Sequence, residues 1–346
     1  MKLSAYYKSQ GKAVVLKTDT ENLADYEKVF ISKVFTKTYV NEEALSAPNV
    51  IIGGTGFFYD TEPKLPQEIE HIMPDYSLYD NHVTEQMKNG AKASALKHYT
   101  DYSIGFLTRG CFRKCSFCVN RNSDTCVLHS PLDEFYDPSR KKIMLLDDNF
   151  LANPNWRELL QQLIELKKTF TFKQGLDIRL VSKEFAVIIN SAKYDMDIFF
   201  SFDNIADSEI IERKLNLLRQ HTKKPVRIYI LCGYDYENNY DTDFWRNDIE
   251  NIFKRLEIIG KYGVTPYLMR HNNYLNSPHA GMYKTLATYC NKMGIFKSCS
   301  FEDFCNAIEV RTVRGNSAAM RYFKTFIEQY PEFRAKYCQK LYWNKP

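Results

Sequence analysis

From Tyr102 onward, short apolar runs alternate with stretches of helical periodicity, and this alternation constrains the fold more than any other feature of the sequence. Strands that are joined by helices form parallel βα units. Six such units over about 170 residues are too few for a complete eight-stranded barrel and predict an α/β fold with a partial barrel. The six predicted strands are Ser103–Thr108, Ile143–Leu146, Phe170–Phe172, Ile198–Phe202, Val226–Leu231 and Thr265–Met269.

Helices are predicted between these strands wherever apolar residues recur at i, i+3, i+4 and i+7. The clearest examples are Trp156–Ile164 and Phe244–Leu256, and a third helix carries Ile210–Leu218. Asp207 or Ser208 is in position to cap this third helix. We therefore expect each strand to be followed by a helix that covers the sheet.

The sequence on either side of this region has a different character. Near the N-terminus, apolar runs at Val29–Phe35 and Val50–Ile52 predict two strands, and the second leads into the glycine-rich residues 53–56. A tight turn is the simpler interpretation of these glycines, and a cofactor loop is the alternative. Residues 57–98 contain several prolines and are predicted to connect the two parts, with a short helix at Pro66–Ile72. Residues 276–346 are predicted to be helical.

Composition limits the classes of protein to which the chain belongs. Of its 346 residues, 44% are hydrophobic and 26% are charged, as in a folded globular protein. The net charge of +5 permits an anionic partner but does not by itself indicate a nucleic-acid-binding protein. The sequence shows neither a signal peptide nor a membrane span, which predicts a cytoplasmic protein without a membrane partner. Because thiols stay reduced there, the nine cysteines are expected to be metal ligands and core thiols.

Three cysteines follow the first predicted strand of the barrel. They are Cys111, Cys115 and Cys118 in the stretch TRGCFRKCSFCVNR. Loops at the carboxyl ends of parallel barrel strands form the reactive face of such folds. Three thiolates on one short loop can bind three irons of a [4Fe-4S] cluster and leave the fourth iron open for a substrate.

This Cys-x3-Cys-x2-Cys spacing, with Phe117 just before the last cysteine, resembles the signature of radical S-adenosylmethionine (SAM) enzymes. The resemblance implies that the open iron binds the amino and carboxylate groups of SAM. It also implies that a low-potential donor such as flavodoxin or ferredoxin supplies an electron, which cleaves SAM to a 5'-deoxyadenosyl radical. The radical would abstract hydrogen from a second substrate, which the sequence does not identify.

Polar residues at the ends of the later strands fit the contacts that SAM would need. Asp147, Asp148 and Asn149 stand where the family accepts a hydrogen bond from the SAM ammonium group, although an acidic turn that caps the next helix is the alternative. The resemblance assigns the remaining contacts to the SAM carboxylate, the ribose or substrate, and the adenine; these are Arg179, Ser201 with Asp203, and Gly233. For Arg179, an internal ion pair with Asp177 or Asp203 is an equal alternative.

The resemblance extends to the N-terminus. The stretches KLSAYYKSQGKAV, GGTGF and PDYSLYD resemble parts of the cobalamin-binding-like, Rossmann-type domain of one radical SAM branch. Residues 1–75 would then be a truncated form of that domain, because its first strand and loop have no counterpart after Met1. Residues to about 98 would be a linker, residues 99–275 the radical SAM partial barrel, and residues 276–346 a helical extension. Cobalamin is not expected, because the first histidine, His71, lies too late for its Asp-x-His-x-x-Gly loop.

Other interpretations stay open at this point. A structural zinc site could recruit Cys126 or His129 as a fourth ligand, and Cys290, Cys299 and Cys305 could hold a second metal or be buried core thiols. A non-enzymatic nucleic-acid-binding protein, or a scaffold that keeps the cluster but has lost turnover, would have the same cysteine loop. The basic residues that could approach a phosphate backbone, or form a solvated helix face, are Arg311, Arg314, Arg321 and Lys324.

Overall fold

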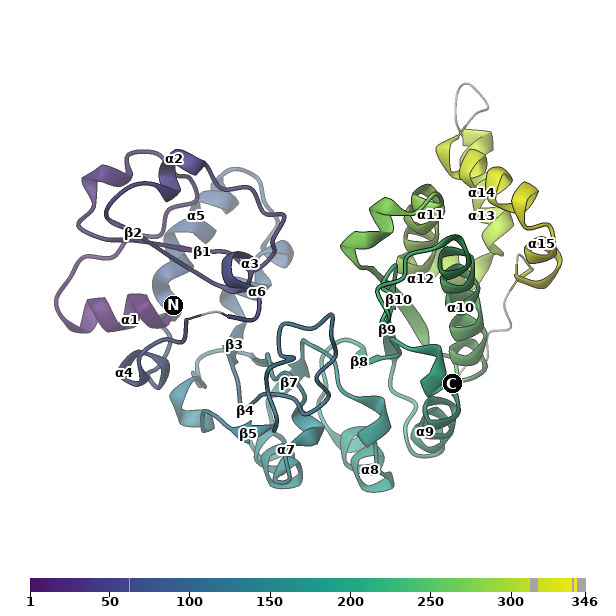
Figure 1. Cartoon of the computed structure of the whole chain (residues 1–346). Coiled ribbons are helices and arrows are strands. Elements are labelled where there is room, and N and C mark those ends of the chain that lie inside the picture. The colour runs from purple at the N-terminus through teal and green to yellow at the C-terminus, as the bar shows by residue number, and fades with distance from the viewer. Residues whose placement is uncertain (62, 312–316, 338, 341–346) are drawn as a thin grey trace. The chain divides into compact units, whose positions relative to one another are not determined.

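The computed structural model describes the chain except for residues 62, 312–316, 338 and 341–346. Internal contacts divide the chain into two compact units (Figure 1). We call Met1–Phe170 the N-terminal unit and Thr171–Pro346 the C-terminal unit. The three regions predicted above remain a prediction.

The first part of the N-terminal unit is a small parallel sheet with short helices. It contains α1 (Lys2–Ser9), β1 (Val29–Ser32), α2 (Glu42–Leu45), β2 (Val50–Gly53) and α3 (Thr55–Phe58). β1 pairs with β2 in parallel, from Val29 opposite Val50 to Ser32 opposite Gly53. Both predicted strands are therefore confirmed, and the first ends three residues earlier than predicted.

The glycines after β2 form a tight turn against β1. Gly54 has a φ of +95°, and a Cβ atom there would lie 2.3 Å from the carbonyl oxygen of Lys33. A Cβ atom on Gly56 would lie 2.5 Å from Cγ of Lys33. The absence of side chains at these positions is therefore explained by the close approach of the two backbones.

The predicted connecting segment contains α4 (Gln67–Glu70), α5 (Asp80–Lys88) and α6 (Lys97–Thr100). Tyr76 fixes this segment to the strands that follow, because its buried hydroxyl donates to the carbonyl of Phe135 at 2.6 Å and accepts from the amide of Ile104 at 2.8 Å. The guanidinium of Arg140 lies 4.2 Å from the centre of the same ring. The segment is thus held by one aromatic side chain with a satisfied polar end.

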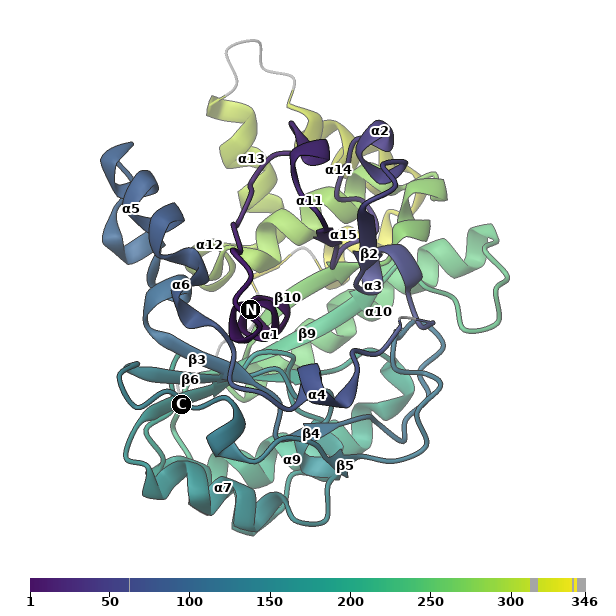
Figure 2. The same ribbon diagram turned by 90° about the vertical axis from the view of Figure 1, so that its left-hand side faces the viewer.

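The second part of the N-terminal unit carries the start of the predicted α/β region. Its elements are β3 (Tyr102–Gly105), β4 (Thr108–Arg109), β5 (Val127–Leu128), β6 (Lys142–Leu145), α7 (Trp156–Glu165) and β7 (Thr169–Phe172). β3 pairs in parallel with β6, and β7 extends the sheet on the far side of β6. α7 buries Leu159, Leu160 and Leu163, and it runs beside this sheet (Figure 2).

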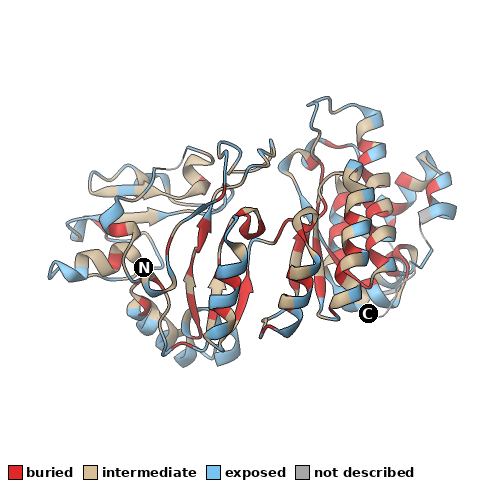
Figure 3. Ribbon diagram, turned by 90° about the horizontal axis from the view of Figure 1, so that it is seen from below, coloured by how far each residue is buried: buried red, intermediate tan, exposed pale blue. Residues whose placement is uncertain are grey.

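The C-terminal unit continues the alternation of strands and helices. Its elements are α8 (Lys183–Ser191), β8 (Ile198–Ser201), α9 (Ser208–His221), β9 (Val226–Cys232), α10 (Thr242–Lys261) and β10 (Thr265–Arg270). The three strands are parallel, with β9 in the middle. Every second residue of β9 is buried, and Ile228 and Ile230 are fully inaccessible. Buried positions concentrate on these strands and on the inner sides of the helices (Figure 3).

The described part of the chain after β10 ends with five helices, which confirm the helical prediction for this region. They are α11 (Ala280–Asn291), α12 (Met293–Ser298), α13 (Phe301–Arg311), α14 (Ala318–Gln329) and α15 (Glu332–Tyr337). Aromatic rings hold them together: Phe301 contacts Tyr289 and Phe323 at centroid distances of 5.5 and 5.8 Å. α14 and α15 flank Pro331, as its missing amide hydrogen predicts.

All six predicted barrel strands are present, and the α/β class is confirmed. The partial barrel is not confirmed, because the strands form two separate three-stranded sheets rather than one. After β7, an isolated parallel bridge joins Leu176 to Phe200 of β8. Among the described residues, no helix combines the length and the apolar character that crossing a membrane requires.

Candidate functional site

The cysteine loop, residues 110–126, connects β4 to β5 in the N-terminal unit. These two short strands are antiparallel, with Thr108 opposite Leu128 and Arg109 opposite Val127, so they close the base of the loop. Cys111, Cys115 and Cys118 are all half-buried thiols. Cys115 and Cys118 lie in a single turn, because the amide of Cys118 donates to the carbonyl of Cys115 at 2.9 Å.

Two aspartates after β6 hold the base of the cysteine loop. Asp147 accepts hydrogen bonds from the amide and the hydroxyl of Thr108, both at 2.6 Å, and from the amide of Leu107 at 3.3 Å. Asp148 accepts from the amide of Gly110 at 2.8 Å and from Nδ2 of Asn120 at 2.8 Å. The acidic turn therefore contacts the cysteine loop directly, whereas its contact with SAM stays a prediction.

Asn149 reaches the first cysteine itself. Its Nδ2 lies 3.3 Å from Sγ of Cys111, and its backbone carbonyl accepts from Sγ of Cys126 at 3.3 Å. Asn149 is only 3% exposed, yet its Oδ1 has no hydrogen-bond partner among the described residues. A buried acceptor without a donor is uncommon and marks a place where a ligand can donate.

The side chains of this acidic turn do not cap the next helix, which was the alternative prediction. α7 has Asn155 at its N-cap, and Asn149 precedes a short 3-10 helix without a side-chain capping bond. Asp147 is instead buried beneath the loop. Desolvation raises the pKa of Asp147 to about 6, although three hydrogen bonds favour its ionised form.

The sequence analysis missed two residues that hold the far side of the loop. The hydroxyl of Tyr59 donates to the carbonyl of Phe117 at 2.6 Å, and Asp60 accepts from Nε of Arg121 at 2.6 Å. Both residues follow α3, where Tyr59 has a φ of +49°. The only sequence signal for them is the glycine turn that starts α3. Phe117 thus contributes a backbone contact to the loop through its carbonyl.

No three His, Cys, Asp or Glu side chains in the described parts of the chain come together as a group that could hold a metal ion. The donor chemistry of the cysteine loop nevertheless fits an iron–sulfur cluster, because three accessible thiols share one loop with a pinned base. Cluster binding would have to draw the thiols together. The unpartnered Oδ1 of Asn149 fits a donor ligand beside Cys111.

The residues considered as zinc ligands already have other contacts. Sγ of the buried Cys126 donates to the backbone carbonyl of Asn149 at 3.3 Å. Nε2 of His129 lies 2.9 Å from Oε1 of Glu70, on α4. Neither residue is positioned as a free fourth ligand for the loop.

Arg179, the predicted contact for the SAM carboxylate, lies in the C-terminal unit and is held by two aspartates. Its Nε is 2.8 Å from Asp177, and its Nη1 is 2.8 Å from Asp207. The internal ion pair with Asp177 was one of the two predicted alternatives, and Asp207 takes the place of Asp203. Asp207 stands at the N-cap of α9 but makes no side-chain capping bond there, so its carboxylate contacts Arg179 instead.

Asp203 and Gly233 belong to a polar network at the carboxyl ends of β8 and β9. Asp203 accepts from the amide of Leu231 at 3.2 Å, and desolvation raises the pKa of Asp203 to about 6. The amide of Gly233 donates to Asp248 at 2.6 Å. Ser201, at the end of β8, is half-buried.

The centre of this network is Arg255 on α10, a residue that the sequence analysis did not identify. It is 1% exposed and donates to the carbonyls of Phe202, Asp203 and Leu231 at 2.9–3.0 Å. Asp248 accepts a further hydrogen bond from the hydroxyl of Tyr283 at 2.7 Å. An arginine in an apolar helix stripe was the available signal, because a buried charge needs partners.

Two of the remaining cysteines are buried in the core, and two of the predicted basic residues are exposed to solvent. Cys290 and Cys305 are buried, and burial strongly raises the pKa of Cys290, as in an inert core thiol. Arg321 and Lys324 are exposed on α14, which fits a solvated helix face. The side chain of Arg311 and all of Arg314 lie outside the described residues.

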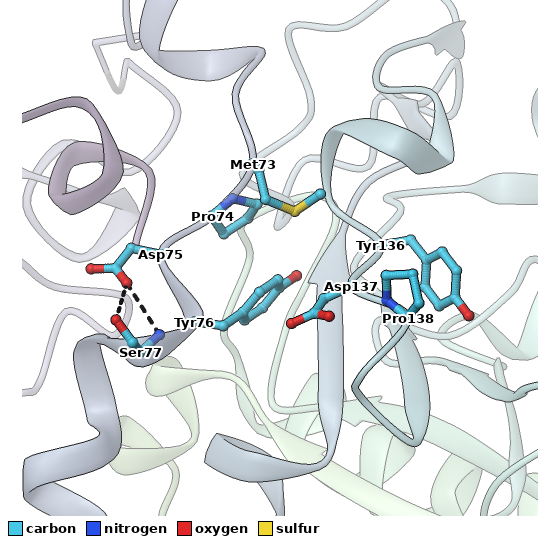
Figure 4. A pocket seen from close by; sticks show the side chains of 8 residues that line it. All are labelled: Met73, Pro74, Asp75, Tyr76, Ser77, Tyr136, Asp137 and Pro138. Atoms are coloured by element: carbon cyan, nitrogen blue, oxygen red, sulfur yellow. Dashed lines mark hydrogen bonds between the residues drawn. The ribbon is translucent and has the colours of Figure 1, made fainter. Parts of the chain in front are cut away.

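A shallow recess of about 410 Å³ in the N-terminal unit lies apart from the cysteines (Figure 4). It is lined by residues 73–77 and 136–138. Both of its carboxylates have partners in the chain: Asp75 pairs with Lys8 at 2.8 Å, and Asp137 accepts from the hydroxyl of Ser139 at 2.7 Å. Both carboxylates of the recess are therefore engaged within the chain.

No family model, curated protein or solved structure matches this chain. The functional argument therefore rests on the cysteine loop and the residues that contact it.

Proposed function

We propose that the protein is a radical SAM enzyme with one [4Fe-4S] cluster bound by Cys111, Cys115 and Cys118. The observation that carries this proposal is the placement of three half-buried thiols on one loop whose base is pinned by the two aspartates that follow β6. The Cys-x3-Cys-x2-Cys spacing supports the same assignment. When bound, the cluster and SAM supply one-electron chemistry that yields a 5'-deoxyadenosyl radical.

The chain's own residues have defined tasks in this proposal. The three thiolates hold the cluster, and Asp147 and Asp148 keep the loop base in place through backbone amides of residues 107–110. Nδ2 of Asn149 donates toward Sγ of Cys111. Its Oδ1 is available to accept a hydrogen bond from the SAM ammonium group.

The zinc alternative receives less support from these contacts. Cys126 is buried and donates to the carbonyl of Asn149, and His129 contacts Glu70, so the fourth ligand that zinc would need is engaged elsewhere. A [4Fe-4S] cluster needs only three protein ligands when a substrate occupies the fourth iron. The three half-buried thiols of the loop thus favour the cluster.

Anaerobic reconstitution with iron and sulfide tests the proposal. We expect a brown protein with about four irons and four sulfides per chain, which forms 5'-deoxyadenosine from SAM only when dithionite is present. Cys115→Ala should lose most of the iron, whereas Cys299→Ala, outside the loop, should keep it.

A colourless protein that carries zinc, or full iron content in Cys115→Ala, would contradict the assignment. A complete cluster without any SAM cleavage would identify a scaffold instead of an enzyme.

A further inference from the structure

One face of the β8–β9–β10 sheet carries aromatic side chains that the helices do not cover. α10 packs against β9 and β10, and the residues that point to the buried face, such as Ile228, Ile230 and Leu268, are at most 2% exposed. The alternate residues point the other way. Phe199, Arg227 and Tyr229 are half-buried and Tyr267 is 38% exposed; we call these four residues the aromatic face.

The four side chains of the aromatic face form one connected surface. The rings of Phe199 and Tyr229 are stacked, with centroids 4.8 Å apart and an interplanar angle of 26°. Tyr267 meets Tyr229 edge-on at 5.6 Å. The guanidinium of Arg227 lies 5.9 Å from the Phe199 centroid and 5.1 Å from that of Tyr267. The sheet register fixes this arrangement, because Arg227 pairs with Phe199 and Tyr229 with Tyr267.

Arg227 gives the aromatic face a positive charge. Its Nε and Nη2 donate to the carbonyls of Pro266 and Asn291, at 3.2 and 3.1 Å. These carbonyls fix the guanidinium plane but do not neutralise it, and no ion pair of Arg227 with a carboxylate is found among the described residues. A cationic plane beside exposed rings is complementary to an anionic aromatic ligand.

The loop after β7 lies against the edge of the Tyr229 ring. Gly175 has a φ of +91°, and a Cβ atom there would lie 3.2 Å from Cε2 of Tyr229, so a side chain at this position would crowd the ring. The two preceding residues, Lys173 and Gln174, are exposed, and an exposed cation is therefore close to Gly175 in the chain.

We infer that the aromatic face binds the nucleobase of a phosphorylated nucleotide, either free or in single-stranded RNA. Bases stack on tyrosine and phenylalanine rings and on arginine planes, and such stacking tolerates different bases. The phosphate supplies the negative charge that Arg227 complements. Binding requires only the C-terminal unit, whereas the further statement that this nucleotide is the enzyme's substrate rests on the proposed function.

Binding is measured on the full chain by calorimetry with adenosine 5'-monophosphate and by fluorescence polarisation with a labelled single-stranded RNA 12-mer. Tyr229→Ala and Tyr267→Ala are each expected to weaken binding about 5- to 100-fold, the range for loss of one base stack. Tyr262→Ala, which removes a half-buried tyrosine of the same unit outside the aromatic face, should leave the affinity unchanged. Saturation by the mononucleotide would identify a small ligand, and saturation by the 12-mer alone would identify RNA.

A separate experiment tests the contribution of the Arg227 charge to binding. Arg227→Gln should reduce the preference for adenosine monophosphate over adenosine, and it should lower the salt dependence of RNA binding by roughly 0.7 in the slope of log K against log salt. A variant in which Cys111, Cys115 and Cys118 are all replaced by alanine should bind the two probes as the wild type does. This arm separates nucleotide binding from the cluster, so either proposal can fail without the other.

Three results would overturn the inference. The first is no binding of either probe at millimolar concentration, and the second is binding that Tyr229→Ala and Tyr267→Ala leave unchanged. The third is displacement of the mononucleotide by S-adenosylhomocysteine, which has no phosphate. That result would assign the aromatic face to the adenine of SAM.

Discussion

Each of the two units has a glycine with a positive φ angle at the end of a strand, and the two glycines lie in different surroundings. Gly110, after β4, and Gly233, after β9, both have positive φ angles, of 94° and 73°. Each donates its amide hydrogen to an aspartate from elsewhere in the chain, Gly110 to Asp148 at 2.8 Å and Gly233 to Asp248 at 2.6 Å. In both places a carboxylate fixes the direction in which the loop leaves the strand.

The surroundings of the two carboxylates differ. Asp248 is 9% exposed and also binds Tyr283, with Arg255 at 4.0 Å. Asp148 is half-buried, and it also accepts from the side-chain amide of Asn120, a residue of the cysteine loop itself. The end of β9 is therefore built into the core, whereas half-buried side chains such as Asp148, Tyr59 and Asp60 hold the cysteine loop. Under the proposed function, this looser hold would let the loop gather three thiols around a cluster.

The largest effect is expected from Arg255→Met in the C-terminal unit. This change removes the positive charge beside Asp248 and leaves three backbone carbonyls without their donor, and breaking a buried pair costs about 3–5 kcal/mol of unfolding free energy. Urea unfolding measures the loss. Lys254→Met, at the preceding and only half-buried position of α10, removes a surface ion pair with Glu250 and should change stability by less than about 0.5 kcal/mol. Equal stabilities of the two variants would show that the network is not a core element.

Alanine at the two glycines compares the units directly. A Cβ atom at Gly233 would lie 2.7 Å from Cβ of Tyr274, and one at Gly110 would lie 2.3 Å from the carbonyl oxygen of Thr125. Both positions also have unfavourable φ angles for alanine, so each change should cost more than about 1 kcal/mol. We expect Gly233→Ala to lower the global unfolding free energy and Gly110→Ala to act mainly on local opening of the cysteine loop.

Native-state hydrogen exchange distinguishes these responses, because local opening leaves core amides protected. A comparable loss of protection in the core of both variants would end the distinction between the two loops.

Asp203 gives a pH-dependent test of the network after β8 and β9. Desolvation raises its pKa to about 6, so the folded protein binds this proton more readily than the unfolded chain does. Its contribution to the unfolding free energy therefore increases as the pH falls from 6 toward 4, by up to roughly 1.4 kcal/mol per pH unit. Asp203→Asn should remove this contribution and leave that of Asp147, whose pKa is also raised to about 6, and urea titrations of both proteins at pH 4.5, 5.5 and 7 measure the difference. Equal slopes in the variant and the wild type would assign the titration to another group.

The smallest effect is expected from Asp148→Asn. The amide keeps one acceptor oxygen but loses the second, so one loop hydrogen bond is lost at a cost of about 1 kcal/mol. Trypsin cleavage after Arg113 or Lys114 should become roughly five times faster, while the midpoint of global unfolding hardly moves. As a control, Asp124→Asn removes an exposed partner of Lys114 and should not alter the cleavage rate as strongly. A large fall in global stability would instead make the cysteine loop part of the core.

The positions of the strands and helices followed from local patterns. Apolar runs and helical periodicity predicted all six strands after residue 102 because burial on a sheet or on a helix face leaves a periodic trace in the sequence. The three cysteines and the acidic turn after β6 were also visible, since chemistry-bearing residues at strand ends are conspicuous. The contacts of Asp147, Asp148 and Asn149 with the cysteine loop came from the structure, and their contact with SAM stays a prediction.

The tertiary structure decided which of these residues contact one another. Three features depend on contacts between residues far apart in the chain. Arg179 pairs with Asp207 rather than with Asp203. Tyr59 and Asp60 contact the cysteine loop, and the six strands are divided between two sheets. A local pattern records whether a residue is buried. It does not record which distant hydrogen-bond donor meets a given carboxylate, because that pairing depends on packing in three dimensions.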